Sequence, residues 1–124
     1  MSIKKLLLIE NDEDNQTLIK FVLKSFTDWE VLTAKDGVEG ITKAESERPD
    51  VILLDFLLPY MDGLEVCEIL KFNLFTCTIP IIFITAMAQQ KILAQLSASL
   101  AEGVIIKPFE IDRLDSQITR IYNS

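Results

Sequence analysis

The sequence predicts an α/β fold: a doubly wound, five-stranded parallel sheet in the order 2-1-3-4-5, with five helices over its two faces. Short apolar runs alternate along the chain with stretches of helical periodicity, which is typical of strands covered on both sides. The 124 residues, of which 49% are hydrophobic, suffice for one domain with a compact core. Right-handed crossovers between successive strands then favour this architecture over others.

Five apolar runs are the expected strands, because a strand inside a parallel sheet is buried on both faces. In chain order they occupy residues 3–9, 29–34, 51–54, 79–84 and 104–106. The stretches between and after them carry the helical pattern, so strand and helix alternate throughout.

Apolar stripes and start signals identify the helices. The first helix has its stripe at Leu18, Ile19, Val22, Leu23 and Phe26, and the last at Ile111, Leu114, Ile118 and Ile121. An aspartate precedes a glutamate by three residues at 36–39 and again at 62–65. This spacing lets a capping side chain and a reciprocal acceptor satisfy free N–H groups, so both pairs predict helix N-termini.

Composition excludes several kinds of chemistry. The chain has 12 basic and 19 acidic residues and a net charge of -7, which disfavours contact with a nucleic-acid backbone. It contains no histidine, which removes histidine ligation of metals, Ser-His-Asp and Cys-His catalysis, and imidazole acid-base chemistry. Any chemistry must therefore use carboxylates, hydroxyls and lysine.

The two cysteines and the N-terminus indicate a cytoplasmic protein. Cys67 and Cys77 are ten residues apart, which fits neither a redox pair nor a zinc site, so we expect reduced structural thiols. The apolar run after Lys4 and Lys5 ends at Glu10 and is too short for a signal peptide or a membrane span. With the last helix ending near Ser124, we expect one domain, residues 1–124, without an output domain.

Polar residues follow four of the expected strands at their carboxyl ends, where sites form in open parallel sheets. They are the acidic run 10–14, Asp55, Thr85 and Lys107. Taken singly, each has an ordinary explanation as a helix start, a turn, a cap or a surface charge. Together they face one crevice, and an aspartate after a buried strand requires a compensating charge, for which Lys107 is the candidate.

With these residues the chain resembles the receiver domains of two-component response regulators, a flavodoxin-like family that includes the single-domain chemotaxis regulator. The resemblance covers essentially the whole chain. It depends on four motifs in combination: Glu10-Asn11-Asp12, the segment 55–63 from the aspartate to Asp62-Gly63, Thr85-Ala86 and Lys107-Pro108-Phe109.

The resemblance implies that Asp55 accepts a phosphoryl group from a histidine kinase or a phosphotransfer domain. Thr85 and Lys107 would bind the phosphoryl oxygens, and the small Ala86 would leave room for them. Mg²⁺ would be the cofactor, since it prefers oxygen ligands. Its implied ligands are Glu10, Asn11, Asp55 and the backbone carbonyl of Leu57.

Three departures from the family pattern concern this site. Asn11 stands where the family has a second acid, so we expect the Mg²⁺ affinity to fall by roughly tenfold or more. Val104 stands where the family has a switching aromatic residue, and valine has no ring to move. Leu57 and Met87 are apolar and cannot orient an attacking water, so the phosphorylated form should be long-lived.

The stretch 86–101 carries a single charge, Lys91. Two interpretations remain open: a surface helix of low charge, or a face for a downstream protein or a homodimer formed by helix four, strand five and helix five. Among the aromatic residues, we expect Phe21, Trp29, Phe72 and Phe75 in the core. Tyr60 and Met61 should line the loop after Asp55, within reach of a partner.

Three hypotheses about the function remain. The first is a phosphorylatable receiver that signals through protein contacts, and the second is a pseudo-receiver, a binding module that no longer depends on phosphorylation. Asn11 and Val104 favour the second; Asp55, Thr85 and Lys107 favour the first. The third is a small flavodoxin-like or hydrolytic enzyme. It is disfavoured because no glycine-rich loop follows the first strand and because the residue two positions after Asp55 is not an acid.

Overall fold

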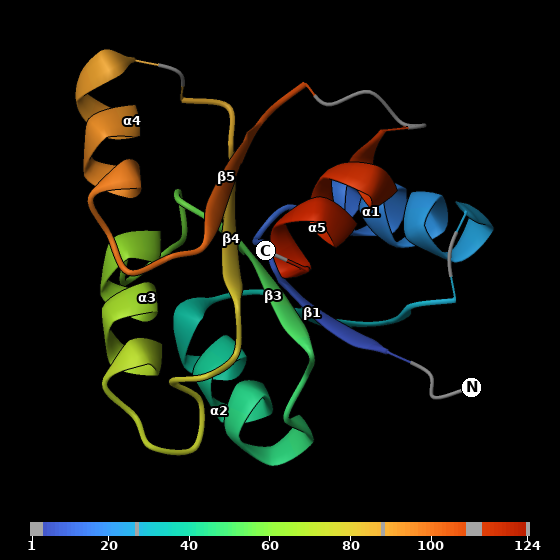
Figure 1. Cartoon of the computed structure of the whole chain (residues 1–124), viewed down its shortest axis with the longest axis horizontal. Helices are drawn as coiled ribbons and strands as arrows, with labels where there is room; N and C mark the ends of the chain where they lie inside the picture. Colours follow the sequence, from blue (N-terminus) through green and yellow to red (C-terminus); the bar gives the residue numbers. More distant parts are fainter. Residues whose placement is uncertain (1–3, 27, 88, 109–112, 124) are drawn as a thin grey trace.

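The computed structural model describes residues 4–26, 28–87, 89–108 and 113–123. Its centre is a parallel sheet of five strands in the order β2-β1-β3-β4-β5 (Figure 1), as the sequence predicts. The strands are β1 (Lys5–Ile9), β2 (Glu30–Ala34), β3 (Val51–Asp55), β4 (Ile81–Thr85) and β5 (Gly103–Ile106).

Five helices cover the two faces of this sheet. They are α1 (Glu13–Phe26), α2 (Gly37–Glu47), α3 (Gly63–Lys71), α4 (Gln90–Ser97) and α5 (Leu114–Tyr122). Helices α1 and α5 pack together on one side, and α2, α3 and α4 lie on the other (Figure 1). Among the described residues, no helix has both the length and the apolar character needed to cross a membrane.

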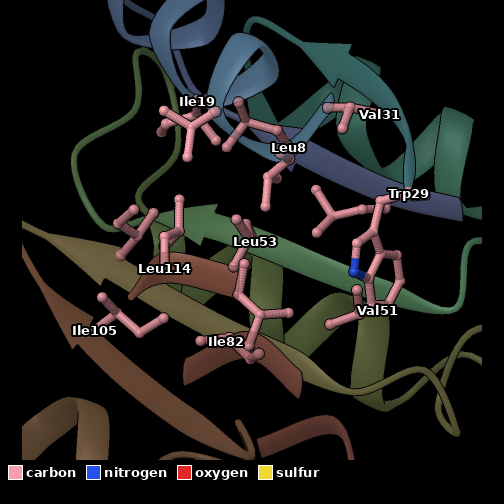
Figure 2. Close-up of a cluster of buried hydrophobic side chains, with 14 residues drawn as sticks. Leu8, Ile19, Trp29, Val31, Val51, Leu53, Ile82, Ile105 and Leu114 are labelled. Carbon is pink, nitrogen blue, oxygen red and sulfur yellow. The ribbon is translucent and has the colours of Figure 1, made fainter. Parts of the chain in front are cut away.

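Each strand contributes to two hydrophobic layers because successive side chains point to opposite faces. Leu8 (Figure 2) and Leu6 lie in the layer under α1 and α5, whereas Leu7 and Ile9 lie in the layer under α2, α3 and α4. All four are completely buried. Burying each of these side chains stabilises the fold by about 2 kcal/mol, which explains why the strands are apolar without alternation.

Both helix starts predicted from the sequence are confirmed. The Asp36 carboxylate accepts from the Glu39 backbone N–H at 2.8 Å. Helix α3 has a complete capping box: Asp62 Oδ1 accepts from the Glu65 N–H at 2.9 Å, and Glu65 Oε1 accepts from the Asp62 N–H at 3.4 Å. The capping box fixes where α3 begins, directly after the loop that follows β3.

The expectation that four aromatic residues lie in the core is confirmed only for Trp29. Trp29 is buried and meets the Tyr122 ring edge-on at a centroid distance of 5.8 Å. Phe21, Phe72 and Phe75 are 68%, 76% and 62% exposed, so for them the prediction is wrong.

The reason is geometric. A helix buries one stripe, and the stripe of α1 contains Ile19, Val22 and Leu23. Phe21 lies outside it, as does Leu18, which was expected in the stripe and is 44% exposed. Phe72 and Phe75 follow the last residue of α3 and stay mostly exposed, although the Arg48 guanidinium lies 5.6 Å from the Phe75 ring centroid. The side chain of Phe26 and the expected stripe residue Ile111 lie outside the described residues.

Candidate functional site

The carboxyl edge of the sheet brings together the polar residues that end four expected strands. Asp55 and Thr85 are the last residues of β3 and β4, and Glu10 and Lys107 come directly after β1 and β5. The register pairs Ile9 with Leu54, so Glu10 and Asp55 leave neighbouring strands at the same level. The Lys107 backbone N–H donates to the Thr85 carbonyl at 2.7 Å, which fixes the start of the Lys107 loop.

A lysine lies between two buried carboxylates. Lys107 Nζ donates to Glu10 Oε1 at 2.8 Å and lies 3.5 Å from Asp55 Oδ2. Glu10 is 2% and Asp55 8% exposed. Burying carboxylates without a counter-charge is costly, and the lysine supplies that charge to both.

The two carboxylates share this single cation, which shifts their ionisation. Burial, together with the hydrogen bond and the charge of Glu10, raises the pKa of Asp55 to about 7, although Lys107 and the Leu57 N–H oppose the shift. Burial also disfavours the charged form of Glu10, but hydrogen bonds with Asp55 and Lys107 outweigh it and lower the pKa of Glu10. Burial works against the charged form of Lys107 too, yet both acids raise its pKa. The site therefore has a surplus of negative charge.

Asp12 and Asn11, which follow Glu10, have different roles. The Asp12 carboxylate accepts from the backbone N–H groups of Asp14 at 2.8 Å and Asn15 at 3.2 Å, so it caps the start of α1. It therefore does not take the place of the missing acid. Asn11 is exposed and offers an amide oxygen at that position.

The donor set fits Mg²⁺. The oxygens expected to hold it are the carboxylates of Glu10 and Asp55, the amide oxygen of Asn11 and the backbone carbonyl of Leu57, and all of these are hard ligands. The buried carboxylates of Glu10 and Asp55 have Lys107 between them, and a divalent cation would supply the further positive charge that two carboxylates can bind. In the part of the chain that the structure describes, no three His, Cys, Asp or Glu side chains group as metal ligands, which agrees with an amide at position 11.

The hydroxyl of Thr85 is completely buried at the end of β4. Its oxygen accepts from the Met87 N–H at 3.0 Å, and its proton has no acceptor among the described residues. The hydroxyl can thus donate to a group placed beside Asp55.

The three apolar residues that depart from the family pattern are placed as follows. Leu57 is 59% exposed, Met87 is half-buried, and Val104 packs against the layer under α2, α3 and α4.

Gly63, the last residue of the second motif, positions the Asp55 backbone, a role that the sequence alone did not indicate. A Cβ at this position would lie 2.6 Å from the Asp55 carbonyl oxygen and 2.9 Å from Phe56 Cα. The Gly63 N–H also donates to the Phe56 carbonyl at 2.8 Å. The first residue of α3 therefore packs directly against the backbone of Asp55. The available signal was a glycine directly after the capping Asp62.

The loop between Asp55 and Gly63 exposes one of its two expected partner residues. Tyr60 is 95% exposed and has a positive φ of 71°. Met61 is half-buried and packs against the layer under α2, α3 and α4. The peptide bond between Lys107 and Pro108 is cis, and Phe109, part of the fourth motif, lies outside the described residues.

Comparisons with known proteins agree with this arrangement. A family model described as the response regulator receiver domain matches residues 6–119. The alkaline phosphatase synthesis transcriptional regulatory protein PhoP of Bacillus subtilis is 35% identical over 121 residues, which cover 95% of this chain and 48% of PhoP. The chain thus spans about half the length of that relative.

Two further relatives are matched along nearly their whole length. The chemotaxis protein CheY of Listeria monocytogenes is 33% identical over 112 residues, covering 89% of this chain and 91% of CheY. The receiver domain of sensor histidine kinase PA1611 from Pseudomonas aeruginosa, solved with a magnesium ion in its active site cleft, has a TM-score of 0.89 and 29% identity, covering 99% of this chain and 100% of that one. The four strand-end residues and these matches lead to one conclusion: the chain belongs to the receiver domains of response regulators.

Proposed function

We propose that Asp55 accepts a phosphoryl group from a phosphohistidine of a histidine kinase or phosphotransfer domain, and that the phosphorylated chain signals through protein contacts. Receiver domains are modules of phosphorylation-based signalling and not enzymes in the ordinary sense. The observation that carries the proposal is Lys107 between Glu10 and Asp55 at the carboxyl edge of the sheet. Asp55 is the buried acid, and Lys107 beside it can neutralise the negative charge of a phosphoryl group transferred to it.

The proposed reaction is an in-line displacement. An oxygen of the ionised Asp55 carboxylate attacks phosphorus, the P–N bond to the donor imidazole breaks, and its electron pair returns to the ring nitrogen. Lys107, 3.5 Å from Asp55, stays close enough to pair with a phosphoryl oxygen, and the Thr85 hydroxyl can donate to another. Mg²⁺, when bound by Glu10, Asn11, Asp55 and the Leu57 carbonyl, supplies charge neutralisation.

Receiver domains work with histidine kinases and phosphotransfer partners, and for this chain the downstream contact is the less defined one. We propose the surface of α4, β5 and α5 for a downstream protein or a homodimer. Two features support it: Ile106 on β5 is 44% exposed, and the short helix α4 has Lys91 as its single charge. Sedimentation of the phosphorylated and unphosphorylated chain would test the homodimer.

Two further expectations stay predictions. A cytoplasmic location fits the free thiols of Cys67 and Cys77, because reduced cysteines are usual in a reducing compartment. The organisation as a single receiver domain without an output domain is tested by the intact mass of the protein isolated from its source.

A pseudo-receiver is the second candidate function, and Asn11 and Val104 favour it. An amide in place of a carboxylate removes one negative charge from the metal site. Val104 offers no ring that could change position when the site is phosphorylated. In this alternative the chain binds its partner in one conformation, whatever the state of Asp55.

The test is intact-mass detection of phosphoryl transfer from a small phosphodonor during a Mg²⁺ titration. One added phosphoryl group that disappears in Asp55→Asn supports the receiver, and Asn11→Asp should then require less Mg²⁺. An adduct that forms only in Asn11→Asp would instead support the pseudo-receiver. An adduct that persists in Asp55→Asn would overturn Asp55 as the acceptor.

A further inference from the structure

Four of the exposed large apolar side chains lie on α3 and the turn that follows it. Of the large apolar residues that are exposed, those in this region are Ile69, Phe72, Leu74 and Phe75 at 42%, 76%, 91% and 62%. Leu100, beyond the end of α4, adds a fifth at 58%. Contiguous exposed apolar surface of this kind marks an interaction site more often than isolated residues do.

The turn that carries these residues is well ordered by its polar groups. The Thr76 hydroxyl donates to the Leu70 carbonyl at 2.7 Å and is completely buried. Asn73 Oδ1 accepts from the Phe75 N–H at 2.8 Å, and the Asn73 carbonyl accepts from the Cys77 N–H at 2.8 Å. The polar groups of the turn thus form hydrogen bonds within it, which fix its backbone. This fixed backbone holds Phe72, Leu74 and Phe75 exposed.

Two adjoining hollows form a groove beside this turn. One, of about 440 Å³, lies between α3 and α4, and α4 stands above α3 in Figure 1; its walls include Leu64, Phe72, Ala98 and Leu100. The other, of about 350 Å³, is lined by Glu65, Glu68, Ile69 and Phe72. Glu68 and Phe72 line both hollows, so the groove continues along α3.

An ion pair ties the two walls together. Lys71, at the end of α3, pairs with Glu102, which follows α4, at 2.5 Å. Glu102 also accepts from the Ile81 N–H at 2.6 Å at the start of β4. Because α3 and the α4–β5 connection are fixed to the same strand, the groove exists before anything binds, which lowers the entropic cost of binding.

The charge of the groove indicates what it fits. The charged residues that line it are Glu65 and Glu68, both exposed. Within the described part of the chain, Glu68 forms no ion pair, and Glu65 only accepts the capping N–H of Asp62. A second copy, with a net charge of -7, would bring like charges to this face, whereas a cationic segment would be attracted.

We propose that the α3–α4 groove, with Phe72 at its centre, binds a basic amphipathic helix of a partner protein. The apolar face of that helix would cover Leu64, Phe72 and Leu100, and its lysine or arginine residues would pair with Glu65 and Glu68. The groove contains none of the residues proposed for the phosphorylation site, and the contact does not depend on phosphorylation.

The test uses ¹⁵N NMR of the whole chain with a synthetic leucine–lysine amphipathic peptide of about 14 residues, four helical turns. The matched peptide carries glutamate in place of lysine. The basic peptide should shift resonances of residues 64–72 and 95–100, and the acidic peptide should not bind. Phe72→Ser should weaken binding about tenfold. Glu68→Gln should weaken it less and reduce its dependence on salt.

Three control variants separate the groove from general attraction to an acidic protein. Phe21→Ser removes a phenylalanine of α1 that is 68% exposed, against 76% for Phe72, and Glu45→Gln removes an exposed acid from α2; both variants should bind the basic peptide normally. Asp55→Asn should also bind normally, which distinguishes failure of this proposal from failure of the phosphorylation site. The proposal is overturned if the shifts spread over the whole surface, if Phe21→Ser weakens binding as much as Phe72→Ser, or if sedimentation shows a dimer that Phe72→Ser dissociates.

Discussion

Replacing Gly63 by alanine should destabilise the fold and impair the acceptor site together. The added Cβ would lie 2.6 Å from the Asp55 carbonyl oxygen, 2.9 Å from Phe56 Cα and 3.0 Å from Phe83 Cε1. Two of these neighbours are backbone atoms at the end of the central strand β3, so they cannot turn aside as a flexible side chain would. The added methyl group can be accommodated only if α3 or the Asp55 backbone shifts.

The magnitude follows from two opposing effects. Forcing an extra methyl group into a packed site costs about 1–3 kcal/mol, and more when backbone must move. Replacing glycine by alanine in a helix returns at most about 1 kcal/mol, and less at the first helical position. We therefore expect a net loss of about 1–2 kcal/mol in the free energy of unfolding.

Urea unfolding followed by circular dichroism measures this loss, and the intact-mass assay measures phosphorylation of the variant. Gly103→Ala is the control, because the three atoms nearest to its Cβ would all belong to the Ile121 side chain, at 2.7–3.1 Å. Gly63→Ala should be phosphorylated more slowly than Gly103→Ala at urea concentrations where both are folded. An unchanged or higher unfolding midpoint for Gly63→Ala would refute the reasoning.

Three further predictions concern the acidic site. Asn11→Asp should raise the Mg²⁺ affinity by about tenfold, measured by calorimetry; an unchanged affinity would mean that position 11 does not reach the metal. The pKa of Asp55 is about 7 in the folded chain against an ordinary 3.8, so the folded state binds the extra proton and metal-free stability should fall as pH rises from about 4 to about 7. Asp55→Asn should therefore stabilise the metal-free chain at pH 8 by roughly 1–3 kcal/mol in urea unfolding, with little effect at pH 4. Leu57→Asn should speed loss of the phosphoryl group by about tenfold or more, because an amide can orient an attacking water and leucine cannot. The loss is measured by intact mass over time, and rapid loss from the native chain would contradict this prediction.

Much of the fold was predictable because its signals are local. The apolar strand Leu6–Ile9 is buried on both faces, and its neighbours in the sheet have the same pattern. The capping box of Asp62 and Glu65 spans three residues and needs no distant partner. Residues at the carboxyl ends of parallel strands converge whatever the details of packing, so the positions of Asp55, Thr85 and Lys107 near one another could also be inferred.

Other features could not be read from periodicity. Phe21, Phe72 and Phe75 are as hydrophobic as Trp29, yet only Trp29 is covered, because coverage depends on which element lies opposite. The close approach of Gly63 to the Asp55 backbone depends on where α3 docks against the end of β3.

The sequence by itself determined the order of strands and helices, the starts of α2 and α3 and the residue types at the carboxyl edge of the sheet, since these depend on side-chain pattern and hydrogen bonds between near neighbours. Only the tertiary structure decided the ionisation of Asp55 and the exposed face beside α3. The pKa of a buried acid depends on distances to groups far along the chain, and Lys107 and Glu10, which meet at 2.8 Å, are separated by 97 positions. Exposure likewise depends on what packs above a residue, and α3 ends with Phe72, Leu74 and Phe75 uncovered.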